Sequence, residues 1–578
     1  MSRPAASPAP AFFLALGLLL VLAACLGPGL IFGLSRYADV EHLRHVRYHD
    51  ATFRYFPIPL TPAGYGRAKL AWLALTAGSA ALLLWQWRRR GRLWRELRGL
   101  RREWRSAPPL LAPWRQLRPA ERRTAGGLLG LLLLVRGYYL LRYPLYGDEV
   151  VTYLSFVREG GLAASSFYPI PNNHVGYSVL GWLFSLLSSN FYWSTRLPTF
   201  LLSAAGTAGV GLLLLRRAGF RVAALTVLLF GFFPYALFQS VVGRGYFLLG
   251  ICAQLGFVAA LALLQGRRRP RLAWAVLVGS SVAGLYAMPS YLLVLGSLGA
   301  ALVAAAGRRP ELRSPLGLAS LVVGAAALLL YAPVMLVSGP RALLANSYVA
   351  PGAGYTAGLT AWDFLVRTDG QLLGGGAWAV VGVGLISLAA LVLAYRRPAW
   401  RPLVLLALAL LWLPYLPLLA RGVYPPARVL SYRVFFLLLL LSLLLDEALR
   451  WRPWAAWRQR LALSVALPVL AWAALAGVVF QRRAAQEATR NERVAQVYAW
   501  LQAHGARGVV AEAPHYQLYL RFFSQTGPGR LRVDATPQPG ASYQYYLVDK
   551  ERRYHLRLPT PSVFENEDVN VHPWPMSR

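Results

Sequence analysis

Thirteen long apolar runs constrain the fold of this chain more than any other feature of its sequence. A helix that spans a bilayer needs about 20 mostly apolar residues. The chain is 57% hydrophobic and 14% charged, whereas a soluble protein carries about 25% charged residues. We therefore predict an all-α polytopic membrane protein with about 13 transmembrane helices. The runs cover residues 10–34, 68–87, 124–142, 197–215, 222–238, 246–265, 272–289, 290–306, 316–337, 376–395, 402–420, 434–449 and 461–480.

Arginine between the runs predicts the orientation of the chain. Cytoplasmic loops of membrane proteins carry an excess of Lys and Arg. Residues 88–123 hold thirteen Arg and three Glu, so this segment is predicted to be cytoplasmic. The later Arg clusters each lie two runs from the next, so one assignment satisfies all of them. It places the N-terminus inside and residues 481–578 outside.

A further apolar stretch, residues 175–189, is too short for a span. Counting it as a span would place the later Arg clusters outside the cell. We interpret it as a helix that lies in the membrane interface or dips into it. The whole loop 143–196 is then extracytoplasmic.

Charge and cysteine content exclude two other classes of protein. The net charge of +37 arises almost entirely from Arg clustered between apolar runs, not from one basic face of a soluble domain, so we expect no nucleic-acid partner. Cys25 and Cys252 both lie inside apolar runs, which excludes a disulfide framework and a Cys/His metal motif. Residues 22–25, Leu-Ala-Ala-Cys, also fit a lipoprotein cleavage box. The alternative, an uncleaved helix, fits the run that continues past Cys25.

Three regions follow from these patterns. Residues 1–123 comprise two helices and the Arg-rich cytoplasmic segment, 124–480 form the main transmembrane domain, and 481–578 form a small α/β domain outside the membrane. In that tail we predict helices at 491–503 and 515–523, and strands at 508–512, 530–534 and 543–550. We find no catalytic spacing in the tail, and interpret His504, His515 and His555 as surface residues.

Carboxylates on the outer face of the main domain are few. The chain has 23 Asp and Glu residues, and after the tail, the first outer loop and the cytoplasmic loops are set aside, five remain: Asp148, Glu149, Glu159, Asp363 and Asp369. Asp148 and Glu149 directly follow an outward-going run, and Gly147 permits a sharp turn there. A carboxylate at the membrane rim, beside a helix bundle that excludes water, suits general-base chemistry near neutral pH.

Further polar motifs share the outer face. They are Asn173-His174-Val175-Gly176, Arg196-Leu197-Pro198-Thr199 and Arg244-Gly245-Tyr246. Together with Asp148-Glu149, their order and spacing resemble those of the GT-C glycosyltransferases, the superfamily of protein O-mannosyltransferases and of bacterial enzymes that add sugars to lipid A. The likeness covers residues 124–260 well, whereas the prolines that follow the histidine in that family are missing here.

The resemblance implies transfer of a sugar, hexose or pentose, from a polyprenyl-phosphate carrier to a lipid, glycan or protein acceptor, with inversion, in a bacterial inner membrane. Asp148 is then the general base, and Glu149 orients the acceptor or shares the proton. Substrate or lipid phosphate is expected to contact Asn173, His174, Arg196, Arg244 and Tyr246. A divalent metal is possible, and the family is not uniform in this respect.

Three further arginines are candidates from their positions alone. Arg428 and Arg433 lie in an outer loop, against the positive-inside bias, and could hold the lipid phosphate, because a guanidinium is a bidentate donor. Ordinary loop charge is the alternative for both. For Arg136, within run 124–142, we favour a side chain that reaches toward the interface.

A transporter or flippase of lipid-linked glycans is the alternative function. Such proteins place charges within helices and contain repeated halves. In this chain the charges lie in loops and no repeat is found, which favours the transferase.

Overall fold

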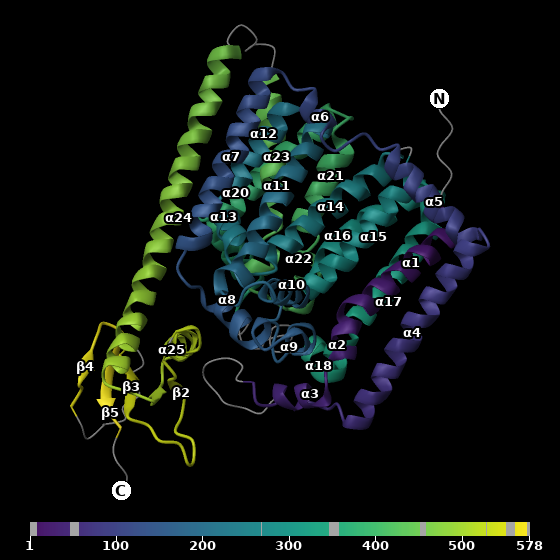
Figure 1. The fold of residues 1–578 in the computed structure, drawn as a ribbon. Coiled ribbons are helices and arrows are strands. Elements are labelled where there is room, and N and C mark those ends of the chain that lie inside the picture. The colour runs from purple at the N-terminus through teal and green to yellow at the C-terminus, as the bar shows by residue number, and fades with distance from the viewer. Residues whose placement is uncertain are drawn as a thin grey trace.

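The computed structural model describes residues 8–46, 57–266, 269–345, 358–450, 458–527, 529–550 and 561–574. Long helices form a bundle, and a small sheet lies beyond one end of it (Figure 1). The predicted fold class, a polytopic helical membrane protein with a small C-terminal sheet, is confirmed.

Nine helices in the described ranges are long and apolar enough to cross a membrane. A tenth span is possible if α12 (Phe220–Phe232) and α13 (Pro234–Val241), whose axes differ by 71°, count as one. The nine are Pro10–Leu34 (α1, η1 and α2), Pro62–Arg88 (α4), Pro119–Arg142 (α7), Tyr192–Ala218 (η3 and α11), Tyr246–Leu264 (α14), Pro289–Arg308 (η4 and α16), Pro310–Val337 (η5 and α17), Ala377–Arg396 (α20) and Arg401–Arg421 (α21 and α22).

The predicted count of thirteen spans is not confirmed. Four of the predicted runs fall on helices that are not among the nine: the bent pair α12 and α13, α15 (Pro270–Ala287), α23 (Arg433–Arg450) and α24 (Arg458–Ala503). α24 has 46 residues and continues without a break from the bundle into the C-terminal region. Cys25 lies within the first of the nine, where η1 (Cys25–Gly29) joins α1 to α2.

The short run at 175–189 forms α10 (Val175–Ser185), a helix of 11 residues. At 1.5 Å per residue it is about 16 Å long, roughly half of a bilayer's hydrocarbon thickness. It lies near α8 (Gly147–Thr152) and α9 (Gly161–Ser166) at one end of the bundle (Figure 1). The run is therefore confirmed as a helix shorter than a span, and its position in the membrane interface stays a prediction.

The predicted inner and outer segments separate to opposite ends of the bundle. α5 (Arg92–Arg105) and α6 (Ala112–Arg115), from the Arg-rich segment, lie at one end. α8, α9, α10, α3 (Tyr37–Leu43), α18 (Pro340–Leu344) and the sheet lie at the other (Figure 1). This arrangement agrees with the arginine distribution. Which end faces the cytoplasm stays a prediction.

The C-terminal region contains a five-stranded sheet in the order β2-β1-β3-β5-β4. β1 is parallel to β2 and β3, whereas β5 is antiparallel to β3 and β4. The three predicted strands and both predicted helices are present, the first helix as the end of α24, and the sequence analysis missed β4 and β5. The elements are β1 (Gly508–Ala511), α25 (Pro514–Thr526), β2 (Arg532–Asp534), β3 (Tyr545–Asp549), β4 (Phe564–Glu565) and β5 (Val569–Pro573).

The C-terminal region packs against the start of the outer loop. The Tyr519 hydroxyl of α25 donates to the carbonyl oxygen of Leu145 at 3.1 Å, and the Asn491 amide of α24 donates to the same oxygen at 3.1 Å. Val150 of α8 shares an apolar core with Tyr516 and other residues of the tail. These contacts hold α25 over α8, which carries Asp148.

Remaining helices connect the spans and shape the outer end. The π-helical η2 (Tyr153–Val157) follows α8 directly. Another helix, α19 (Ala361–Leu373), begins with a capping box in which Thr360 and Asp363 satisfy each other's backbone N–H. The 3₁₀ helix η7 (Ala427–Leu430) carries Arg428 just before α23.

Candidate active site

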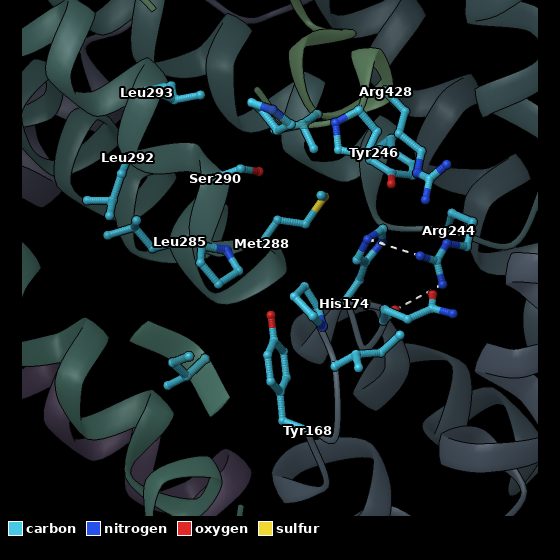
Figure 2. Close-up of a pocket in the computed structure, with 18 of the residues that line it drawn as sticks. Tyr168, His174, Arg244, Tyr246, Leu285, Met288, Ser290, Leu292, Leu293 and Arg428 are labelled. Carbon is cyan, nitrogen blue, oxygen red and sulfur yellow. Dashed lines mark hydrogen bonds between the residues drawn. The ribbon is translucent and has the colours of Figure 1, made fainter. Parts of the chain in front are cut away.

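A cavity of about 1470 Å³ opens at the end of the bundle where α8 and α10 lie. One part of its wall is apolar and comes mainly from α15, α16, α17 and α22, including Leu285, Leu292 and Leu328. The other part carries polar side chains from the outer loops. Figure 2 shows His174, Arg244 and Arg428 across the cavity from Leu292 and Leu293. The cavity is therefore amphipathic along its length.

Asp148 lies on the cavity wall in the first turn of α8. Its side chain is 25% exposed, and its Oδ2 lies 3.7 Å from a terminal nitrogen of Arg428. Among the described residues Oδ2 has no hydrogen-bond partner. The carboxylate thus has a cationic neighbour, and capacity to accept a further hydrogen bond or a proton.

Arg244 forms a buried positive centre on the same wall, 2% exposed. Its Nη1 donates to the carbonyl oxygens of Asp148 at 3.1 Å and Asn172 at 3.0 Å, and to the Thr152 hydroxyl. In the part of the chain that the structure describes, Arg244 forms no ion pair, and its Nε has no hydrogen-bond partner. A buried charge without a counter-ion is costly. An anion bound beside Arg244 would supply the missing counter-ion.

His174 lies beside Arg244 and is 2% exposed. The Gly245 N–H donates to Nδ1 at 3.0 Å, so a neutral ring carries its proton on Nε2. Burial, with the charges of Arg244 and Arg428, holds the pKa of His174 well below its usual value. Nε2 lies 3.2 Å from Nη2 of Arg244 (Figure 2). Two N–H groups therefore converge where one anionic oxygen could accept from both.

Gly245 and Tyr246 explain the Arg-Gly-Tyr motif. A Cβ on Gly245 would lie 2.9 Å from Cβ of His174, so a larger residue would displace the histidine. The ring of Tyr246 packs edge-on against the imidazole, with 4.7 Å between centroids, and lines the cavity. The motif thus positions His174 as well as Arg244.

Glu149 and Arg196 lie behind the cavity wall as a fully buried ion pair, each 0% exposed. Nε of Arg196 is 3.1–3.2 Å from the two carboxylate oxygens. Arg196 also donates to the carbonyl oxygens of Tyr143 and Pro144, at 2.6 and 2.8 Å. Glu149 accepts from the Gly243 N–H at 2.9 Å. The pair therefore joins the end of α7 and the start of α8 to the loop that carries Arg244.

Besides Arg196, two more of the predicted binding residues lie away from the cavity wall. The Asn173 amide donates to the carbonyl oxygens of Ala164 and Phe167, at 3.2 and 2.8 Å, which closes the loop before α10. Arg433 pairs with buried Asp369 at 2.7 Å and contacts the Tyr415 hydroxyl. Arg428, by contrast, lines the cavity.

Arg136 does not reach the interface, and that expectation is wrong. Its side chain is 1% exposed and donates to the carbonyl oxygen of Ser203 and the hydroxyl of Thr207, each at 2.9 Å. It also lies over the ring of Phe247. Arg136 thus joins α7 to α11 inside the bundle.

The C-terminal region contributes to the site, which the sequence analysis missed. Glu487 and Arg490 of α24, with His515 and Tyr519 of α25, lie on the cavity wall. The interpretation of His515 as a plain surface histidine is thus wrong, and His555 lies outside the described residues. No local motif marks these four residues, because their role depends on how α25 packs against α8.

The side chains in the described ranges do not form a metal centre. No group of three or more His, Cys, Asp or Glu there is arranged to hold a metal ion. Glu149, the neighbour of Asp148, is occupied by Arg196. The possible divalent metal does not fit this arrangement.

Comparison with known proteins identifies the fold. The sequence matches no protein-family model and has no significant similarity to a curated protein. The structure is similar to that of ArnT from Cupriavidus metallidurans bound to undecaprenyl phosphate, with a TM-score of 0.53 and 15% identity, over 78% of this chain and 97% of that one. Apo ArnT gives a TM-score of 0.51 with the same identity and coverage.

A third similar structure is arabinosyltransferase EmbB from Mycobacterium smegmatis. Its TM-score is 0.40 at 16% identity, over 65% of this chain and 34% of that one. ArnT is a GT-C glycosyltransferase, and the similarity to ArnT shows that the present chain has the GT-C fold. The chain is an integral, multi-pass membrane protein of that architecture.

Proposed function

We propose that this protein is a membrane glycosyltransferase that moves a hexose or pentose from a polyprenyl-phosphate carrier to a lipid, glycan or protein acceptor at the outer face of a bacterial inner membrane. One observation carries the proposal. A single cavity combines a long apolar wall with the carboxylate of Asp148 and the buried charge of Arg244, which forms no ion pair within the described ranges.

The two parts of the cavity match the two parts of a polyprenyl phosphate. Apolar side chains of α15, α16 and α17 suit the isoprenoid chain. Arg244 and Arg428, with the Nε2–H of His174, suit the phosphate, because charge-assisted N–H donors bind phosphate oxygens strongly. The similarity in fold to ArnT, which was solved with undecaprenyl phosphate, supports this assignment.

The reaction needs a base and a stabilised leaving group. Asp148 takes the proton of the acceptor hydroxyl, and the oxygen forms a bond to the anomeric carbon of the sugar. The bond from that carbon to the phosphate oxygen breaks, and its electron pair leaves on the phosphate. Arg244 stabilises that charge as it develops. One displacement of this kind inverts the anomeric configuration.

Glu149 and Arg196 act in this proposal without touching substrate. Their ion pair sets the position of α8 relative to the loop of Arg244. Asp148 and Arg244 depend on this spacing, because a small displacement of reacting groups costs a large factor in rate.

A deletion strain tests the proposed function even while the donor sugar and the acceptor are unidentified. In the deletion strain, mass spectrometry should show a surface glycan or glycolipid that is lighter by the mass of one sugar residue. Wild-type protein should restore that mass, and Asp148→Asn should not. A transporter without transferase activity predicts instead that Asp148→Asn restores the glycan. An unchanged set of glycans in the deletion strain would contradict the proposal.

A further inference from the structure

A second, smaller cavity of about 180 Å³ adjoins the first. The two cavities share five residues in their walls: Tyr146, Arg244, Tyr246, Pro426 and Arg428. A group bound to Arg244 and Arg428 therefore has the large apolar cavity on one side and this small one on the other.

Most of the wall that the small cavity does not share with the large one comes from α13, which follows a break after α12. Pro234 has no N–H to donate, and at this point the axis of α13 turns by 71° from that of α12. α13 then presents Tyr235, Phe238 and Gln239 to the cavity, and α19 adds Gln371.

Gln239 has an unused hydrogen-bonding atom at this wall. The residue is 4% exposed, and among the described residues its buried Oε1 has no hydrogen-bond partner. An amide oxygen buried without a partner costs free energy, and a bound hydroxyl or amine would satisfy it. A ligand can therefore supply the hydrogen-bond donor that Oε1 of Gln239 lacks.

The lining combines aromatic rings with carboxamides. An amide both donates and accepts, as the hydroxyls of a sugar do, and aromatic side chains provide flat apolar surfaces. Pockets for small molecules have this composition, with a few polar groups that fix orientation. The volume suits one monosaccharide ring and is too small for two linked rings.

We propose that the small cavity binds the sugar of the donor as a single ring, and that Gln239 is a specificity residue that hydrogen-bonds one of its polar groups. The inference rests on the proposed function. Arg244 and Arg428 then hold the phosphate between the two cavities, with the lipid chain in the large one and the sugar in the small one.

Binding to purified full-length protein tests this inference without the acceptor. The probes are bare undecaprenyl phosphate and synthetic undecaprenyl phosphates that carry arabinose, glucose, mannose, galactose, N-acetylglucosamine or a disaccharide. At least one monosaccharide probe should bind more tightly than the bare lipid phosphate. Gln239→Leu keeps the size of the side chain but removes the amide. It should reduce the affinity for that probe by about three- to tenfold and leave the affinity for the bare lipid phosphate unchanged.

Two further variants serve as backup and control. Gln371→Leu changes an exposed residue of the same wall and should also weaken that probe, which keeps the test valid if Gln239→Leu fails to fold. Gln254→Leu, equally buried at 5% exposure but on neither cavity wall, should change no affinity.

Three results would overturn the sugar site. They are equal binding of all probes by the wild type, an unchanged preference in Gln239→Leu and Gln371→Leu, and tightest binding of the disaccharide probe. The deletion-strain experiment is independent of these results. Loss of one sugar there, combined with any of them, would refute the sugar site while the transferase function stands.

Discussion

Arg244 is joined to Asp148 through the backbone: its Nη1 donates to the carbonyl oxygen of Asp148 at 3.1 Å. The guanidinium thus holds the position of Asp148 without pairing with its carboxylate. The residue proposed to bind the leaving phosphate and the residue proposed as base are therefore kept at one spacing. The carboxylate instead pairs with Arg428, whose terminal nitrogen lies 3.7 Å from Oδ2.

Arg244→Lys should impair use of the donor although it keeps the charge. Lysine cannot reproduce the planar set of donors that reaches Thr152, Asn172 and the phosphate. Loss of one partner of a buried charge contact costs about 2–5 kcal/mol, so Arg244→Ala should bind undecaprenyl phosphate far more weakly than wild type. Arg142→Ala, an exposed arginine at the end of α7, is the control. Undiminished lipid-phosphate affinity in Arg244→Ala would remove this residue from the site.

Glu149→Gln should chiefly reduce stability, because it leaves Arg196 buried without its counter-ion. Removal of one partner of a buried ion pair costs about 3–5 kcal/mol. Thermal unfolding in detergent should show a lower Tm for Glu149→Gln and for Arg196→Met than for Asp148→Asn, whose side chain is partly exposed. Equal Tm values for Glu149→Gln and Asp148→Asn would contradict a structural role for the ion pair.

Acid should destabilise the protein through His174. The folded state holds the pKa of this histidine well below its usual value of about 6.5, because of burial and the charges of Arg244 and Arg428. Below pH 6.5 the unfolded chain binds a proton that the folded chain does not bind. Stability is therefore full above pH 6.5 and falls as the pH drops toward the folded pKa, by up to about 1.4 kcal/mol per pH unit.

His174→Gln removes this titration. The decrease in Tm between pH 7.5 and pH 5.5 should be smaller in the variant than in wild type. A decrease of the same size in both proteins would show that other groups cause the acid sensitivity.

Cysteine labelling in intact cells tests the orientation. Ser189→Cys and Ser542→Cys place exposed thiols in the predicted outer loop and in the C-terminal region, and Ser106→Cys places one at the opposite end of the bundle. The native Cys25 and Cys252 are each 4% exposed, so their background should be low. An impermeant maleimide should label the first two variants and not the third. The reverse pattern would invert the topology.

Much of the site could be predicted from the sequence because its motifs follow or precede spans at one face of the membrane. Asp148, His174 and the pair Arg244 and Tyr246 lie in three separate segments, and the structure brings all four residues to one cavity wall. Their depth is set by the spans, and hydropathy identifies spans well.

The different roles of Asp148 and Glu149 could not be predicted in this way. Successive residues on a helix point roughly 100° apart, so in α8 one carboxylate faces the cavity and the next faces Arg196. Likewise, the sequence predicts Arg428 and Arg433 in one loop, yet Arg433 begins α23 and only Arg428 lines the cavity. These directions depend on where each helix begins, which sequence patterns locate poorly.

Contacts between segments that are distant in the chain could not be predicted from the sequence either. Tyr519 reaches the wall because α25 packs against the loop at Leu145, more than 370 positions earlier in the chain. Gln239 reaches its cavity because of the bend at Pro234. Neither residue has a local signal of function.

The most direct test of the account is sugar transfer by Asp148→Asn. The rate of sugar transfer is measured for the purified variant and for wild type. Both receive as donor the undecaprenyl-phosphate sugar that wild type uses, and as acceptor the one identified from the deletion strain. Loss of a general base costs about 10²–10⁴ in rate, and donor affinity should change little. Glu159→Gln, whose carboxylate contacts His42 away from the cavity wall, is the control and should remain active. Asp148→Asn should fold normally and be nearly inactive, whereas near-normal turnover by this variant would contradict the assignment of Asp148 as the base.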